Sequence, residues 1–423
     1  MIQQKGNFKD VIVFGFALFA MFFGAGNLIF PPYLGIITGP EWLTAFGGFT
    51  FADAGLALLA VMATAKYDGD VIALFRRAGG KLAIVLGCAD ILCIGPFLAI
   101  PRTGATTYEM GIMPLLGDAI PIAVFAAIFF ILTYILTIKP SKVVDIVGQF
   151  LTPALLIALA ILIVKGVISP LGEIRPDTLV PSVFAEGINQ GYQTMDTLAA
   201  TVFSTIVIVS IMDKGYDDEK LMVKATIGAG AIAVIGMGLV YGGLCYLGAT
   251  VSTQYGMDVE QTALIVAITE ALLGQTGKIL LAIIVALACL TTSIGLTSAA
   301  GRYFSGLTNG KLKYEHIVVG VCVFSAVISN FGVSTIIKFS APILSIVYPA
   351  TITLIILSLF GHKIKNDNVF KCATYMALLI SVLTIAGVEF IVTLPGYQFG
   401  FNWILPVAAA AIIGNFIPSK KAA

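Results

Sequence analysis

The sequence predicts an all-α polytopic membrane protein with about 12 transmembrane helices, and three observations lead to this fold class. Charged residues make up 11% of the 423 positions, apolar residues make up 58%, and the mean hydropathy is +1.00. Soluble globular domains contain about 25% charged residues, so a chain this apolar needs lipid as its solvent. Apolar runs of about 20 residues, the length that crosses the hydrocarbon as an α-helix, recur along the whole chain. The third observation is the distribution of lysine and arginine.

Twelve apolar runs are expected to span the bilayer, and an even number places both termini on one side. If that side is the cytoplasm, most of the 24 Lys and Arg residues fall in its loops and termini, as the positive-inside rule requires. Only Arg102, Lys165, Arg175, Lys278 and Lys338 fall elsewhere. We therefore expect a multi-pass protein of a cytoplasmic membrane with both termini cytoplasmic. The expected spans cover residues 10–37, 42–64, 82–104, 119–138, 146–168, 190–212, 225–249, 279–301, 316–331, 339–361, 371–394 and 402–418.

Several classes of partner and cofactor do not fit the sequence. No basic arm or aromatic-interleaved basic stripe indicates nucleic acid. The six cysteines and two histidines lack the paired spacing of a metal site, so no resident cofactor is expected. The first apolar run continues through Pro31 and Pro32 without a clean signal-peptide cleavage site, which predicts a retained first span. The oligomeric state is left open.

The order of the spans suggests an internal duplication within a single transmembrane domain, residues 1–423. Residues 10–168 and 190–361 each contain five spans, and two extra helices follow at about 371–418. Because five is odd, the second repeat runs through the membrane upside down, and such inverted repeats place a substrate site between broken helices. Residues 261–273 are apolar but too short to cross, and Glu270 interrupts them, so we expect an outer lid there.

The first span contains the strongest candidate site, the run from Gly24 to Pro32. Two glycines and Asn27 weaken a helix in mid-span, and Pro31 cannot donate its backbone hydrogen bond. Opened backbone at this depth must line a cavity or protein. Free carbonyls would suit a cation or an ammonium group, and the N–H groups of the resumed helix would suit a carboxylate. The alternative interpretation is a glycine-rich packing seam with a proline kink.

The sixth span, the counterpart of the first in the second repeat, carries Asp196. An ionisable residue inside a span is costly and is functional by default, so Asp196 is the leading single-residue candidate. The alternative is a solvated position in the outer mouth. No glycine pair marks a break here. Asp53, Asp90 and Glu389 are weaker candidates of the same kind.

The eighth span contains adjacent hydroxyls at Thr291, Thr292 and Ser293. Two hydroxyls and a carbonyl one turn earlier would give three hard oxygen ligands for Na⁺. The alternative is that these hydroxyls bond only to the carbonyls of their own helix.

Three segments together resemble the branched-chain amino acid:cation symporter family, over essentially the whole chain. They are GAGNLIFPP at 24–32, GPFLAIPRT at 95–103 and YQTMDTLA at 192–199. The resemblance implies the five-helix inverted-repeat fold of leucine and neurotransmitter:sodium symporters, with breaks in helices 1 and 6. It also implies import of leucine, isoleucine and valine with Na⁺ or H⁺ in bacterial cytoplasmic membranes.

Carried over by motif, the resemblance implies two sets of site residues. The substrate would contact Gly24, Ala25, Gly26 and Asn27 in the first span and Gln193, Thr194, Asp196 and Thr197 in the sixth. The sodium site would use the carbonyls of Ala20, Phe23 and Cys289 with the hydroxyls of Thr292 and Ser293, or Thr291 in place of Ser293 after a shift of one residue.

One departure from the family pattern concerns the outer gate. Sodium symporters of this fold usually carry an arginine just after the first break, where this chain has Phe30, and Arg102 is a candidate replacement. A proton-coupled permease or exchanger of other neutral amino acids remains the alternative function. A channel is disfavoured because no ring of charges is visible, and an intramembrane enzyme because no nucleophile–base or metal constellation lies in the spans.

Overall fold

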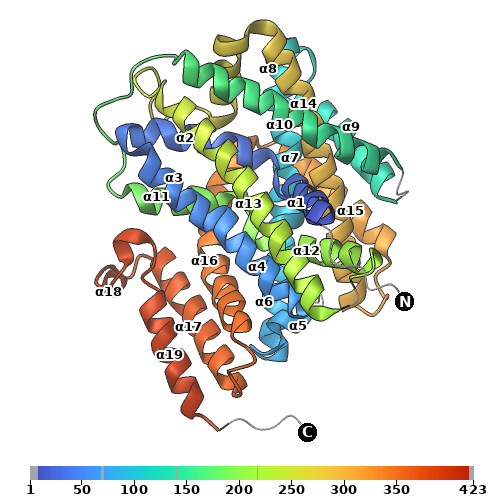
Figure 1. Ribbon diagram of the computed structural model, residues 1–423, viewed down its shortest axis with the longest axis vertical. Helices are drawn as coiled ribbons and strands as arrows, with labels where there is room; N and C mark the ends of the chain where they lie inside the picture. The colour runs from blue at the N-terminus through green and yellow to red at the C-terminus, as the bar shows by residue number, and fades with distance from the viewer. Residues whose placement is uncertain (1–7, 68–70, 139–141, 217, 419–423) are drawn as a thin grey trace.

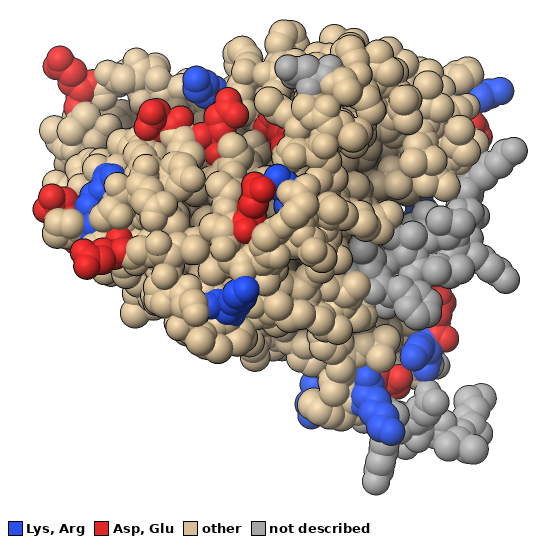
Figure 2. All heavy atoms as spheres, turned by 90° about the horizontal axis from the view of Figure 1, so that it is seen from above, with Lys and Arg blue, Asp and Glu red and all other residues tan. Residues whose placement is uncertain are grey.

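The computed structural model describes residues 8–67, 71–138, 142–216 and 218–418, and all regular structure in these ranges is helical. The expected cytoplasmic residues Lys5, Lys139, Lys420 and Lys421 lie outside the described residues. By length and composition, seven of the described helical segments could cross a membrane, and four shorter helices are also apolar. The face drawn in Figure 2 is mostly uncharged, with Lys, Arg, Asp and Glu scattered over it. The all-α membrane fold is therefore confirmed.

The helices follow one another in the order expected for two five-helix units and an extra pair (Figure 1). The first unit comprises α1 (Phe8–Phe22), α2 (Ala25–Thr38), α3 (Trp42–Thr50), α4 (Leu56–Ala65), α5 (Val71–Arg76), α6 (Gly80–Leu92), α7 (Ala99–Thr107), α8 (Met113–Leu116), α9 (Ile122–Ile138) and α10 (Lys142–Ile168). The second comprises α11 (Val183–Thr194), α12 (Asp196–Asp213), α13 (Glu219–Ala249), α14 (Gln261–Leu307), α15 (Tyr314–Ser329) and α16 (Val333–Leu359). The extra helices are α17 (Asp367–Ile385), α18 (Glu389–Val392) and α19 (Ile404–Phe416).

Both expected helix breaks are present, but each differs from the expectation in detail. The first span stops after Phe22 and resumes at Ala25, so Pro31 and Pro32 lie inside the resumed helix α2 and not at the break. The sixth span breaks at Met195, whose φ of 67° is rare for a residue with a side chain. No glycine is used there, which explains why composition gave no sign of the break.

The segment expected to form an outer lid is the first part of α14. Residues 261–273 are helical, and the chain then turns at Gly274, where φ is 67° and ψ is −163°. Only glycine adopts such a conformation readily. Gly274 therefore lets the chain bend between the short helix and the eighth span without an intervening loop. The Thr262 hydroxyl near the start of α14 donates to Glu109 Oε2 at 2.7 Å.

Close backbone contacts hold the resumed half of the first span in place. A Cβ atom built on Gly35 of α2 would lie 1.9 Å from the carbonyl oxygen of Cys245 on α13. A Cβ on Gly248 of α13 would lie 1.9 Å from the carbonyl oxygen of Pro32 on α2. Neither contact tolerates any side chain, so these two glycines set the distance between α2 and α13.

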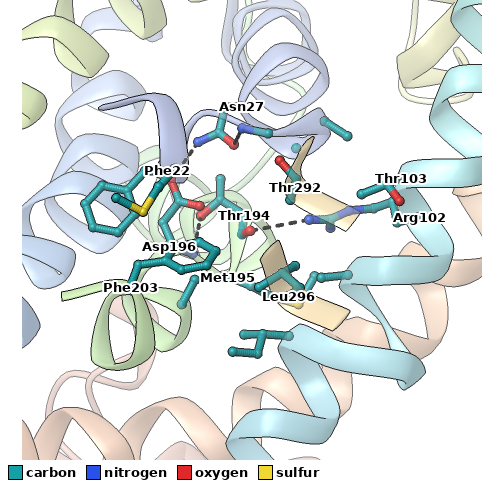
Figure 3. Close-up of a pocket in the computed structure, with 17 residues that line it drawn as sticks. Phe22, Asn27, Arg102, Thr103, Thr194, Met195, Asp196, Phe203, Thr292 and Leu296 are labelled. Carbon is teal, nitrogen blue, oxygen red and sulfur yellow. Dashed lines mark hydrogen bonds between the residues drawn. The ribbon is translucent and has the colours of Figure 1, made fainter. Parts of the chain in front are cut away.

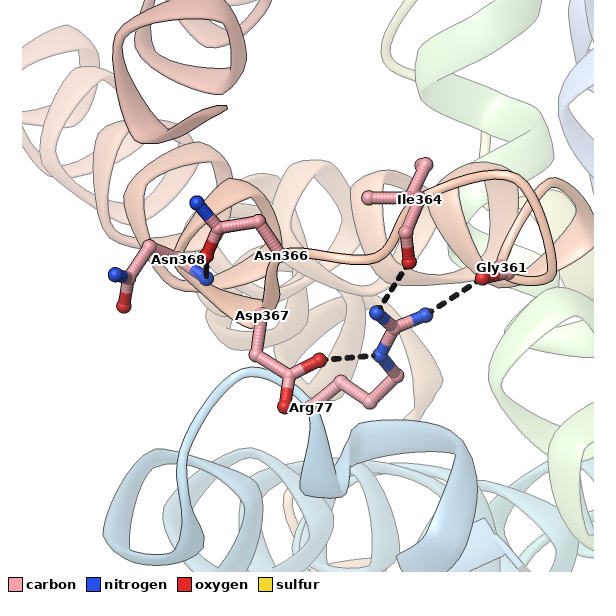
Figure 4. A network of polar contacts seen from close by, with 6 residues as sticks. All are labelled: Arg77, Gly361, Ile364, Asn366, Asp367 and Asn368. Carbon is pink, nitrogen blue, oxygen red and sulfur yellow. Dashed lines mark hydrogen bonds and ion pairs between the residues drawn. The ribbon is translucent and has the colours of Figure 1, made fainter. Parts of the chain in front are cut away.

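The extra helices α17 and α19 pack against each other, and α17 packs on α16 (Figure 1). Figure 4 shows how Arg77, which follows α5, joins this end of the molecule. Its guanidinium donates to Asp367 Oδ1 at 2.6 Å and to the carbonyls of Gly361 at 2.9 Å and Ile364 at 2.6 Å. The Arg77 side chain is 21% exposed, so water can reach this network.

Candidate functional site

A small cavity lies between the two helix breaks (Figure 3). It offers about 30 Å³ to the centres of water molecules, which is room for about two waters. Six polar side chains line it, namely Asn27, Arg102, Thr103, Thr194, Asp196 and Thr292. The apolar part of its wall comes from α1, α2, α7, α12, α14, the segment before α7 and the break at Met195. Its apolar side chains are Met21, Phe22, Ala25, Ile94, Ala99, Met195, Ala199, Phe203 and Leu296.

Asn27 joins three helices at the edge of this cavity, which explains why the break requires an amide. Its Oδ1 accepts the N–H of Gly24 at 2.9 Å, and its Nδ2 donates to Asp196 Oδ2 at 2.7 Å. The same Nδ2 donates to the hydroxyl of Tyr241 on α13. Only a side chain with both donors and an acceptor can make all these bonds. In a continuous helix the N–H of Gly24 would donate to the carbonyl of Ala20. Here it donates to the Asn27 side chain instead.

The break in the sixth span places Asp196 at the start of α12, facing the cavity. Its side chain is 4% exposed, which argues against the solvated-mouth interpretation. The Thr194 hydroxyl lies 2.7 Å from Asp53 Oδ1 and 2.6 Å from the Gly191 carbonyl oxygen. Thr194 therefore ties the last turn of α11 to the second span.

Arg102 fills the space between α7 and the sixth-span break, and it is 3% exposed. Its Nη1 donates to the Gln193 carbonyl at 2.6 Å and its Nη2 to the Thr194 carbonyl at 3.3 Å. Helix ends leave such carbonyls without partners, so Arg102 caps α11 where the chain opens. The guanidinium also lies 5.3 Å from the centre of the Phe30 ring. Arg102 thus belongs to the cavity wall.

Six of the eight expected substrate residues line the cavity, namely Gly24, Ala25, Gly26, Asn27, Thr194 and Asp196. The other two point elsewhere. Gln193 accepts a hydrogen bond through Oε1 from the Ser340 hydroxyl on α16 at 2.6 Å. Thr197 donates to the Ala52 carbonyl at 3.2 Å. Their side chains hold the sixth span against its neighbours.

The two hydroxyls expected to bind the cation, those of Thr292 and Ser293, face different sides of the eighth span. Thr292 faces the first break, because a Cβ on Gly24 would lie 3.6 Å from Thr292 Oγ1. Ser293 is fully buried, with its Oγ 3.3 Å from Thr133 Oγ1 on α9, and it does not line the cavity. Thr291 Oγ1 lies 2.9 Å from the Ala288 carbonyl oxygen. Ala20, Phe23, Cys289 and Thr291 also lie outside the cavity lining. No group of three or more potential metal-binding side chains occurs among the described residues.

The carboxyl candidates rated as weaker differ sharply from one another. Asp53 is fully buried next to Thr194 and Asp196, so it belongs to the site. Asp90 is also fully buried but meets the Thr201 hydroxyl at 3.1 Å, away from the cavity lining. Glu389 is exposed at the start of α18. Sequence position alone did not separate these three cases.

Comparison with known proteins gives consistent matches over the whole chain. A family model described as "Branched-chain amino acid transport protein" matches residues 7–421. The branched-chain amino acid permease BraB of Bacillus subtilis is 39% identical, covering 98% of this chain and 97% of the relative. The branched-chain amino acid transport system 2 carrier protein of Pseudomonas aeruginosa is 36% identical, covering 98% and 96%.

Two solved structures share the fold at low sequence identity. The inward-facing conformation of Mhp1 superposes with a TM-score of 0.65 at 14% identity, covering 96% of this chain and 89% of Mhp1. MhsT in complex with L-phenylalanine superposes with a TM-score of 0.61 at 16% identity, covering 95% and 97%. These matches show the same five-helix inverted-repeat fold.

Proposed function

Since the chain belongs to the branched-chain amino acid transport protein family, we propose that it imports leucine, isoleucine and valine together with Na⁺ by alternating access. The chain is a multi-pass membrane transporter and not an enzyme. The observation that carries the finer proposal is the cavity between the two breaks. It combines a helix N-terminus, a buried carboxyl and apolar side chains in a space inside the bundle.

The cavity suits each part of a zwitterionic aliphatic amino acid. The free N–H groups in the first turn of α2 and the unused N–H groups of Arg102 can bind the α-carboxylate. Asp196 can pair with the α-ammonium group. The apolar side chains of Phe22, Ile94 and Leu296 can enclose a branched aliphatic side chain. Because the cavity has room for only about two water molecules, substrate entry requires the wall to move apart.

A Na⁺ site at the junction of the first and eighth spans would use oxygen ligands only, as a hard cation prefers. The carbonyls of Ala20 and Phe23 lie where the ladder of α1 ends, and Thr292 faces the same break. Ser293 Oγ lies against Thr133, and Thr291 Oγ1 bonds to the carbonyls of Leu287 and Ala288, so either hydroxyl must exchange its present partner for the cation. We propose Thr291 as the second hydroxyl, because its Oγ1 and the Ala288 carbonyl oxygen already lie 2.9 Å apart and could bind one cation together. This favours the shifted register over the pair Thr292–Ser293 with the Cys289 carbonyl.

We predict that leucine accumulates in proteoliposomes only when an ion gradient is imposed. No phosphate-binding G-x-x-x-x-G-K-[ST] loop occurs in the sequence, so no ATP site is evident. One Na⁺ moving down about 100 mV gains roughly 2.3 kcal/mol, and a tenfold gradient adds roughly 1.4 kcal/mol. Together they could sustain accumulation on the order of 500-fold. Imposing Na⁺ and pH gradients separately distinguishes Na⁺ coupling from H⁺ coupling, and accumulation with ATP alone would refute both.

We predict that Thr292→Ala raises the half-saturating Na⁺ concentration for leucine uptake by about tenfold or more, the loss of one direct ligand. Thr291→Ala should act in the same direction, whereas Ser293→Ala should leave this concentration near that of the wild type. If Ser293→Ala raised the half-saturating Na⁺ concentration and Thr291→Ala did not, the site would instead use Thr292, Ser293 and the Cys289 carbonyl. If neither single variants nor the double variant Thr291→Ala/Thr292→Ala changed Na⁺ dependence, the proposed site would be wrong.

A further inference from the structure

The carboxyl groups of Asp53 and Asp196 come together in the interior, although they lie in different repeats. Asp53 is in the π-helical turn Phe51–Gly55 that interrupts the second span, and Asp196 begins α12. Thr194 brings them together, because its Oγ1 lies 2.7 Å from Asp53 Oδ1 and 3.4 Å from the backbone N of Asp196, and the two side chains are 0% and 4% exposed. Interrupted segments of the second and sixth spans therefore meet at a pair of buried acids.

The hydrogen bonds around the pair leave one position unfilled. Asp196 Oδ2 accepts from Asn27 at 2.7 Å, and Asp53 Oδ1 is bonded to the Thr194 hydroxyl. Asp53 Oδ2 has no donor with normal geometry among the described residues, although the Tyr241 hydroxyl approaches the same carboxyl group. Two ionised carboxylates only accept hydrogen bonds, so two neighbouring carboxyl groups can bond to each other only when one of them carries a proton.

The charges that face the pair do not balance two ionised carboxylates. Arg102 on α7 is the cation acting on Asp196, but it donates to backbone carbonyls and not to a carboxylate. Tyr241 on α13 and Tyr348 on α16 are neutral phenols, and Asp90 on α6 acts on Tyr348 and not on the pair. An uncompensated buried charge is strongly destabilising. One proton on the pair leaves one negative charge opposite Arg102.

We propose that Asp53 and Asp196 share one proton in this conformation and form a proton-binding site next to the substrate cavity. This deepens the proposed function, because Asp196 also lines that cavity. A proton from water forms an O–H bond on one carboxyl as the spans close, and water accepts it when the cavity opens. The proton allows the two acids to meet, so closure around the substrate weakens as pH rises. Leucine affinity should therefore fall with increasing pH.

The first test is the variant Asp53→Asn in the full-length protein. An asparagine amide supplies an N–H toward Asp196 permanently, where the wild type needs the shared proton. With Na⁺ held constant between about pH 5.5 and 8.5, wild-type leucine affinity should fall by up to about tenfold per pH unit while the pair titrates. Asp53→Asn should change by less than about twofold over the same range. A variant that keeps the wild-type pH profile would overturn the proposal.

Asp90→Asn is the matched control, because Asp90 is equally buried but bonds to Thr201 and does not line the cavity. It should keep the wild-type pH dependence. If Asp53→Asn does not fold, a second measurement replaces it. The Asp90→Asn protein is placed in weak buffer, and the protons that it takes up when leucine binds are measured. Uptake supports the pair, and no uptake at any pH overturns it. Proton release on addition of Na⁺ alone would also overturn it, since the pair would then be a sodium site.

Failure of this inference can be separated from failure of the proposed function. Leucine binding without pH dependence would refute the proton site and leave the transport proposal intact. If the protein bound no leucine, the infrared carbonyl signal of a buried carboxylic acid would still test the pair. That signal should disappear in Asp53→Asn on the Asp90→Asn background, and an unchanged signal would refute the proposal.

Discussion

Gly26→Leu should lower leucine affinity by at least about 100-fold while the protein still inserts and folds. Gly26 lines the cavity in the first turn of α2. A Cβ atom there would lie 3.0 Å from Arg102 Nη2 and 3.0 Å from Cε2 of Phe30, so even a methyl group requires a shift. The rest of the leucine side chain would occupy a cavity of about 30 Å³. Binding of labelled leucine and the melting temperature of the purified protein measure the two effects separately.

Two other glycines provide controls for this variant. Gly320 lies exposed on α15 with no atom within 4 Å of a built Cβ, so Gly320→Leu should change neither binding nor stability. Gly35→Leu should lower stability and expression, because its Cβ would lie 1.9 Å from the Cys245 carbonyl oxygen. If Gly26→Leu behaved like Gly35→Leu, Gly26 would be a packing residue. Near-normal leucine binding by a stable Gly26→Leu protein would contradict both interpretations.

The sequence predicted the spans and the first break because both depend on local properties. Apolar length determines which segments cross the bilayer, and Gly24, Gly26 and Asn27 weaken a helix wherever they occur. The role of Asn27 was only partly predictable. That its amide bridges Gly24, Asp196 and Tyr241 depends on helices more than 160 residues apart in the sequence.

The sixth-span break was expected only because the repeat has an inverted counterpart. Met195 adopts φ of 67° although nothing in its side chain favours that conformation, so its surroundings must impose it. The helix also changes direction there, so residues on either side cannot be placed by extending one periodic pattern. This is why Gln193 and Thr197 face neighbouring helices and not the cavity. The sequence likewise gave no sign that Asp53 belongs to the site, because its partner Thr194 is distant in sequence.

Arg102→Leu is expected to abolish leucine binding and to lower the melting temperature strongly. The substitution leaves the carbonyls of Gln193 and Thr194 without donors in a buried site, at about 1–3 kcal/mol each. It also removes the positive charge that acts on Asp196. The loss of both donors is already a large part of the roughly 5–15 kcal/mol that stabilises a typical protein. Thermal unfolding in detergent and leucine binding in liposomes test the two consequences.

Arg77→Leu is the matched control, because Arg77 also donates to two backbone carbonyls and acts on one aspartate (Figure 4). Its partner Asp367 is 52% exposed, so water can replace the lost bonds and the cost should be within about 1 kcal/mol. Arg102→Lys separates charge from shape, because an ammonium group keeps the charge but lacks the planar fork that reaches both carbonyls. We expect Arg102→Lys to recover part of the stability and little of the binding. Equal effects of Arg102→Leu and Arg77→Leu would mean that burial at the break adds nothing, and the role assigned to Arg102 would be wrong.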